Sequence, residues 1–153
     1  AAMAPTGAFM CFLALFSGAV WGRPTWGAYW VWDARLTSEL ILLFLYLGFL
    51  ALQSSIADIK RADKACALIA LVGVVNVPII YFSVRWWNTL HQGASITSRG
   101  SSIATIMLVT LLLMVAAFWI YSLAATFART RTIILERERR ETWAQEAAIK
   151  GEI

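Results

Sequence analysis

The chain has 153 residues, of which 60% are hydrophobic and only 14% are charged, whereas a typical soluble domain is about 25% charged. Polar groups are too few to cover the surface of a water-soluble globular enzyme, so that class of protein is strongly disfavoured. The formal net charge of +4 is too modest to indicate nucleic acid as a partner.

Four long apolar runs predict an all-α protein, a polytopic transmembrane helix bundle with four spans. The runs cover residues 2–20, 36–53, 65–84 and 103–127. Each is long enough to cross a hydrocarbon core of ~30 Å as a helix. Helices buried in a soluble bundle are the weaker alternative, because such helices carry polar residues at every third or fourth position. We expect a four-span membrane domain over residues 1–127 and a charged tail over residues 128–153.

Small and polar residues within the runs have structural interpretations. The first run carries a stripe of small residues that suits close helix packing, namely Gly7, Cys11, Ala14 and Gly18. Glu39 is expected in the first turn of the second helix, where the helix dipole favours an acidic residue and Thr37 is a candidate N-cap. In the third run, Asn76 precedes Pro78 and is a candidate for a local hydrogen bond to the carbonyl of Val74, which the proline disturbs.

The basic residues predict which ends of the spans face the cytoplasm. Nine of them lie between the second and third runs or after the fourth, namely Lys60, Arg61, Lys64, Arg129, Arg131, Arg137, Arg139, Arg140 and Lys150. The other four lie in the opposite connections, namely Arg23, Arg35, Arg85 and Arg99. The positive-inside rule places the larger group in the cytoplasm. The segments 21–35 and 85–102 are therefore expected to face the periplasm together, with the charged tail in the cytoplasm.

The segment 21–33 holds four of the eight tryptophans of the chain. An interfacial aromatic belt would explain one or two of them, but it explains poorly four that alternate with glycine, proline and charged residues. Pro24 suits the first position of a short helix, and such a helix would place Trp26, Trp30 and Asp33 on one face. We expect an aromatic platform that consists of Trp21, Trp26, Tyr29, Trp30, Trp32 and Asp33.

A large, flat, π-rich ligand with charge at its edge would suit this platform, and haem has these properties. Arginine pairs well with carboxylates, so Arg35 is predicted to bind a haem propionate, with Arg23 as the second candidate. The alternative for Arg35 is an ion pair with Asp33 or with lipid phosphate.

The connection at 85–93 contains the only histidine of the chain, His91. A lone histidine in a loop is more often a surface or capping residue than a ligand. Its position on the side of the platform, in a loop with Trp86, Trp87 and Asn88, favours a role as axial ligand of haem iron. The three neighbours are expected to support it.

Two segments resemble a known family. Residues 21–38 are similar to the tryptophan-rich signature of the WWD haem-handling proteins. The end of this segment, Trp-Asp-Ala-Arg-Leu-Thr-Ser at 32–38, resembles the haem exporter protein C family (CcmC) of cytochrome c maturation. Haem lyases of the same superfamily tend instead toward Trp-Asp-Pro-Val-Glu-Asn. Residues 86–93 resemble the last periplasmic loop of the haem exporter protein C family, and with the spans the resemblance covers nearly the whole chain.

The resemblance implies a fold and a function. Members of this family are six-span subunits of the bacterial inner membrane that bind haem b without a covalent bond and present it, at the periplasmic face, to a membrane-anchored haem chaperone. They act with an ABC-type ATPase, its membrane subunit and a small accessory membrane subunit. Two loop histidines ligate the iron in the family, and His91 matches the second. The first belongs to a loop that this chain lacks, so the chain is expected to be the C-terminal portion, spans three to six.

The chain is expected to be a binding module rather than an enzyme. No catalytic residues follow from the resemblance, and the sequence has no G-x-x-x-x-G-K-[ST] loop for nucleotide. Two alternatives stay open. One is a haem–apocytochrome c lyase of the same superfamily, which the Ala-Arg-Leu-Thr-Ser ending disfavours. The other is a membrane scaffold or permease subunit that binds no haem and whose tryptophans only anchor it in the bilayer.

Overall fold

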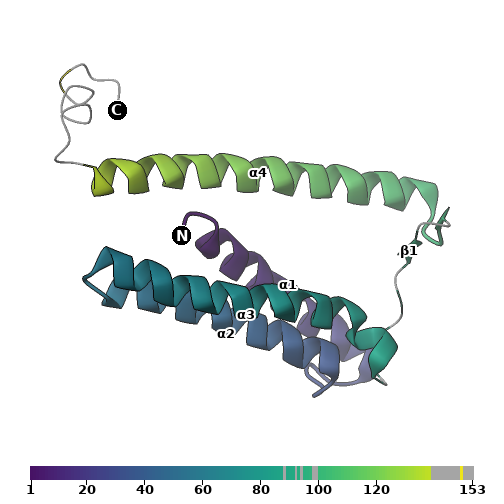
Figure 1. The fold of residues 1–153 in the computed structure, drawn as a ribbon. Coiled ribbons are helices and arrows are strands. Elements are labelled where there is room, and N and C mark those ends of the chain that lie inside the picture. The colour runs from purple at the N-terminus through teal and green to yellow at the C-terminus, as the bar shows by residue number, and fades with distance from the viewer. Residues whose placement is uncertain (88, 92, 94, 98–99, 139–148, 150–153) are drawn as a thin grey trace.

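In the computed structural model, four long helices follow one another along the chain, with a short hairpin before the last. The elements are α1 (Ala4–Trp26), α2 (Ala34–Ser55), α3 (Ile59–Trp86), β1 (Ile96–Thr97), β2 (Gly100–Ser101) and α4 (Thr105–Arg137) (Figure 1). The structure describes residues 1–87, 89–91, 93, 95–97, 100–138 and 149. These four helices are long and apolar enough to cross a membrane, so the prediction of an all-α fold with four spans is confirmed.

The first helix is longer than its apolar run and ends at a glycine. α1 continues to Trp26, and Gly27 then adopts a left-handed conformation with φ of 79° while its amide bonds to the carbonyl of Arg23. Glycine adopts this conformation without steric cost, which makes it a common helix terminator. Pro24 lies inside the last turn of α1 and does not begin a new helix. The prediction that a helix from Pro24 carries the aromatic platform on one face is therefore wrong.

Aspartates begin the second and third helices. Asp33 precedes α2, and its Oδ1 accepts the amide of Leu36 at 2.8 Å. Asp58 precedes α3 in the same way, and its carboxylate accepts the amides of the second and third residues that follow it. The prediction of Thr37 as the N-cap of the second helix is wrong, because Asp33 is extended and its short carboxylate already satisfies a free amide of the first turn.

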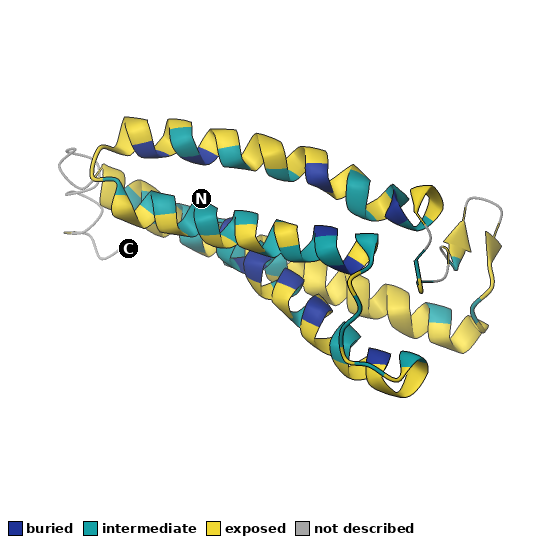
Figure 2. Ribbon diagram, turned by 90° about the horizontal axis from the view of Figure 1, so that it is seen from below, coloured by how far each residue is buried: buried dark blue, intermediate teal, exposed yellow. Residues whose placement is uncertain are grey.

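Helix α2 packs against both α1 and α3, and most other helix surface is exposed, as Figure 2 shows. Gly7 allows close packing of α1 on α2, because a Cβ at this position would lie 2.5 Å from the ring of Tyr46. Cys11 is buried, and its thiol donates to Oε1 of Glu39 at 3.2 Å. Gly18 has no side-chain neighbour within 4 Å. Only the first half of the predicted stripe of small residues therefore packs against another helix.

Asn76 joins the second and third helices. It is buried, and its side-chain amide donates to the carbonyl of Ser38 on α2 at 2.9 Å. The prediction of a local bond inside α3 is wrong, because α2 lies against this face of α3 and offers an acceptor there. A buried amide needs such a partner, since an unpaired one is costly in an apolar environment.

Replacing Asn76 with leucine should lower the stability of the α2–α3 pair by about 1 kcal/mol, since hydrogen bonds between membrane helices contribute about this much. Leucine has a similar branched shape but cannot donate to the carbonyl of Ser38. Thermal unfolding in detergent measures the effect. Ser17→Ala is the control, because the Ser17 hydroxyl bonds only within its own helix, to the carbonyl of Leu13 at 2.7 Å, and the residue is exposed. Equal melting temperatures for Asn76→Leu and the wild type would contradict the prediction.

Helix α4 runs beside the other three and contacts them mainly at one end, where the N-terminus lies (Figure 1). Arg129 donates to the hydroxyl of Thr6 and to the carbonyl of Ala2. Arg137 forms a two-pronged ion pair with Asp63 on α3, at 3.1 and 3.0 Å. The helix continues without a break through residue 127, so the charged tail begins as a helix. Residues 139–148 and 150–153 of the predicted tail lie outside the described residues.

Candidate functional site

The two segments singled out in the sequence meet at one end of the helices. The connection 27–33 lies between α1 and α2, and the described residues 89–91 follow α3 at the same end, on the right in Figure 1. A contact between Asp33 and His91 joins them across 58 positions of the chain. The predicted proximity of the aromatic segment and the histidine loop is therefore confirmed.

Asp33 holds the imidazole of His91. Its Oδ2 lies 2.7 Å from Nδ1, while its Oδ1 caps α2. The side chains are well shielded, with 6% of Asp33 and 19% of His91 exposed. The backbone amide of His91 donates to Oγ1 of Thr89 at 3.2 Å, which further fixes the loop. Within the described chain Nε2 makes no hydrogen bond, so Nε2 is the ring nitrogen that a ligand can reach.

Two tryptophans of α1 lie near this histidine, and one of them contacts it. The ring of Trp26 meets the imidazole edge to face, with centroids 4.8 Å apart. Trp21 meets Trp26 in the same manner at 5.3 Å. Gly22 makes room for the Trp26 ring, because a Cβ at this position would lie 3.2 Å from both that ring and the carbonyl oxygen of Ala28. We refer to Trp21, Trp26, Asp33 and His91 as the His91 cluster.

The ring contacts divide the four tryptophans of the predicted platform into two pairs. Trp30 and Trp32 form the second pair, edge to face at 5.4 Å. Trp32 is 74% exposed and Tyr29 is 62% exposed. In the described part of the chain Nε1 of Trp30 is buried without an acceptor, which costs about 1–3 kcal/mol. A water molecule or a polar group of a bound molecule would relieve that cost.

The end of α3 adds further aromatic rings beside the histidine loop. Phe82 stacks on Trp86 at 5.3 Å, and Trp86 meets Trp87 at 5.9 Å. Both tryptophans are exposed. Asn88, the third residue predicted to support the loop, lies outside the described residues.

A cavity of about 370 Å³ lies beside the His91 cluster and has a size typical of small-molecule sites. It is lined by Trp21, Arg35, Tyr81, Val84, Arg85, His91, Gly93 and Ser95. Two cations thus share one cavity with the histidine. Among the described residues Arg35 forms no ion pair with Asp33, whose oxygens bind His91 and the start of α2. The alternative that Arg35 pairs with Asp33 is therefore wrong. The alternative that Arg35 pairs with lipid phosphate stays open.

The second arginine of the cavity is Arg85 rather than Arg23. Arg23 donates to the carbonyl of Gly27 and lies over the ring of Tyr29, 5.5 Å from its centroid, and it does not line the cavity. Arg85 was overlooked as a site residue in the sequence. The sequence does contain a signal for it, because Arg85 directly follows the third apolar run and directly precedes the two tryptophans of the histidine loop.

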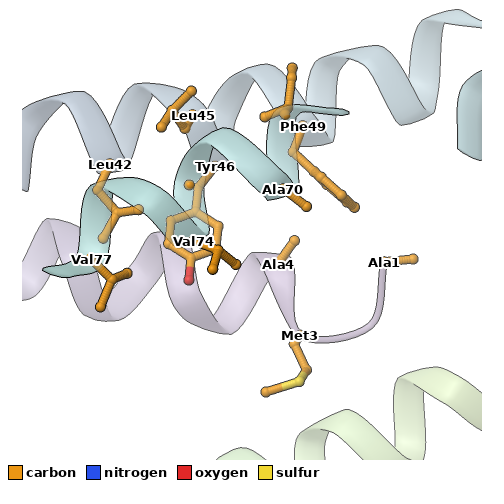
Figure 3. A pocket seen from close by; sticks show the side chains of 12 residues that line it. Ala1, Met3, Ala4, Leu42, Leu45, Tyr46, Phe49, Ala70, Val74 and Val77 are labelled. Carbon is orange, nitrogen blue, oxygen red and sulfur yellow. The ribbon is translucent and has the colours of Figure 1, made fainter. Parts of the chain in front are cut away.

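An apolar pocket of about 260 Å³ lies nearer the opposite end, between the start of α1 and the facing sides of α2 and α3 (Figure 3). Its side chains are apolar apart from the hydroxyl of Tyr46, which points into it. Among the described residues that line it, the tyrosine hydroxyl is the only ionisable side-chain group.

The chemistry available at the His91 cluster is the donation of one nitrogen ligand. The described residues contain no group of three or more histidines, cysteines or carboxylates that could hold a metal ion by themselves. A single imidazole beside aromatic rings and two arginines instead suits an iron that already has most of its ligands, and whose carrier is flat, apolar and anionic at its edge.

Known proteins resemble this chain over almost its whole length. Residues 1–145 match the family described as "Heme exporter protein C". The chain is 49% identical over 150 residues to heme exporter protein C of Escherichia coli (strain K12), which covers 98% of the chain and 60% of that relative. It is 51% identical over 148 residues to the protein of the same name from Haemophilus influenzae, with 96% of the chain and 60% of the relative covered. The chain thus spans about three fifths of the length of these relatives.

Proposed function

The chain belongs to the haem exporter protein C family, and on this premise we propose that it binds haem and hands it over without a chemical step of its own. In this proposal the His91 cluster faces the periplasm of a bacterium, and the acceptor is the membrane-anchored haem chaperone of cytochrome c maturation. One observation carries the proposal: a histidine held by a carboxylate lies at a cavity that two arginines also line.

The histidine would bind iron through Nε2, because Nδ1 is occupied by Asp33. The porphyrin, haem b without a covalent bond, would enter the cavity along Trp21, which shares the lining with His91. Aromatic rings pack well on such a flat π-system. A second histidine ligand, which the family resemblance implies, would not be one of these 153 residues, because they contain one histidine.

The proposed partners follow from the resemblance to the family. In the proposed complex an ABC-type ATPase with its own membrane subunit supplies any ATP hydrolysis, since the sequence itself contains no G-x-x-x-x-G-K-[ST] loop. A small accessory membrane subunit completes the proposed complex. The exposed Trp32 and the exposed pair Trp86 and Trp87 are the surface that we assign to the chaperone.

Replacing Arg35 should weaken haem binding, because a hydrogen-bonded charge pair contributes about 1.5–3 kcal/mol. We expect about a tenfold loss of affinity or more for Arg35→Ala. We expect a smaller but measurable loss for Arg35→Lys, since lysine keeps the charge but cannot bind a propionate with two parallel bonds. Haem titration of the full-length protein in detergent, followed at the Soret band, measures both.

Arg61→Ala is the control for these variants. Arg61 is exposed and pairs with Asp58 at the start of α3, at the opposite end of that helix from the cavity. The Arg61→Ala variant should bind haem like the wild type. Wild-type affinity in both Arg35 variants would leave the lipid-phosphate alternative as the explanation of this arginine.

A transfer assay tests the proposed function. The haem-loaded full-length protein is mixed with the purified chaperone or with apocytochrome c, and haem is followed on each acceptor. Haem on the chaperone supports the proposal. Covalent haem delivered directly to apocytochrome c would identify a lyase, and a purified protein without a Soret band would identify a scaffold.

A further inference from the structure

The carboxylate of Asp33 is shielded from solvent, and each of its two oxygens has a hydrogen-bond partner. Only 6% of the side chain is exposed, and its two oxygens have different partners. Oδ1 accepts the amide of Leu36, and Oδ2 lies 2.7 Å from Nδ1 of His91. A shielded carboxylate is costly unless it is paired and hydrogen-bonded, so both contacts are needed to hold it there.

We propose that Asp33 is the positioning residue of the iron ligand: it fixes the tautomer and the orientation of His91 so that Nε2 carries the lone pair. This inference rests on the proposed function. An ionised carboxylate can only accept, so its partner nitrogen Nδ1 must carry the proton. In a neutral imidazole the free electron pair then lies on Nε2.

The contact between Asp33 and His91 also fixes the position of the histidine relative to the helices. Asp33 caps α2, and His91 lies in the connection after α3, so one side chain links the start of one span with the loop after another. Trp26 packs on the imidazole at 4.8 Å and restricts its rotation. A carboxylate partner also raises the basicity of a metal-bound histidine. With haem bound, Asp33 would therefore affect the strength of the iron bond as well as its direction.

A second aspartate, Asp58, provides a control that distinguishes the positioning of His91 from helix capping. Asp58 caps α3 as Asp33 caps α2, but its carboxylate binds backbone amides and the exposed Arg61 and contacts no histidine. Asparagine is as good an N-cap as aspartate. Asp33→Asn and Asp58→Asn should therefore have similar, small effects on unfolding, and only Asp33→Asn should alter the histidine.

Two measurements on the full-length protein test the inference. Nitrogen NMR of ¹⁵N-histidine-labelled, haem-free protein reports the tautomer, with the His91 signal assigned by its loss in His91→Ala. We expect the proton on Nδ1 in the wild type and in Asp58→Asn, and a changed tautomer population in Asp33→Asn. With haem added, Asp33→Asn should lose about 10- to 100-fold in affinity, and its reduction potential should rise because the ligand becomes less basic.

A wild-type tautomer, affinity and potential in Asp33→Asn would overturn the inference. The haem-free spectrum keeps this test separate from the proposed function. If the wild type binds no haem, the proposed function fails. The NMR result then still shows whether Asp33 fixes the tautomer of His91.

Discussion

Replacing His91 with alanine should remove most of the haem from the purified full-length protein, with the Soret absorbance per protein reduced about tenfold or more. The imidazole is the iron ligand in our account, and alanine offers no replacement. Adding imidazole should restore part of the absorbance, because the deletion leaves space beside Trp26 and Asp33, which contact the ring in the wild type. Absorption spectra with and without imidazole measure both effects.

Leu90→Ala is the matched control for this experiment. Leu90 precedes the histidine in the same loop and is exposed. It does not line the cavity that His91, Arg35 and Arg85 line. It should retain haem like the wild type. Thermal unfolding of both variants shows whether the unpaired Asp33 destabilises the fold. A folded His91→Ala protein with an unchanged Soret band would refute the assignment of the ligand.

Removing the two tryptophan pairs should have different consequences. The pair Trp21 and Trp26 belongs to the His91 cluster, so a double alanine variant should lose haem, with affinity reduced about tenfold or more. Each edge-to-face contact contributes about 0.5–1.5 kcal/mol beyond the area that it buries. The pair Trp30 and Trp32 should matter for handover instead, since Trp32 is 74% exposed. Haem titration and the transfer assay separate the two effects.

The two double variants control for each other, because each removes two indole rings from the same short segment. A variant that lacks all four rings should neither retain nor transfer haem. Normal transfer by the four-ring variant would contradict the aromatic role altogether. Equal haem loss from both double variants would contradict the division into two pairs.

The spans were predictable because local composition determines them. The apolar run 36–53 became α2 at Ala34–Ser55, nearly as expected. The first span was predicted too short, because its last turn, with Arg23 and Pro24, looks polar while Gly27 is what ends the helix. The predicted short helix from Pro24 is wrong for the same reason, because Pro24 lies inside α1.

Most components of the candidate site were predictable, but Arg85 and the contacts between the residues were not. His91 stands out as the only histidine, and Arg35 by its place beside the tryptophans. No local pattern relates Asp33 to His91, since 58 positions separate them and the contact depends on how α2 and α3 pack. Likewise, Asn76 was assigned a local partner, although packing gives it Ser38. The exchange of Arg23 for Arg85 in the cavity also depends on tertiary structure.

A cryo-EM structure of the haem-loaded full-length protein would test the central claim most directly. The account predicts iron bonded to Nε2 of His91, with Nδ1 still on Asp33 and the propionates toward Arg35 and Arg85. Iron bound elsewhere, with the His91 ring turned away from the porphyrin, would contradict it.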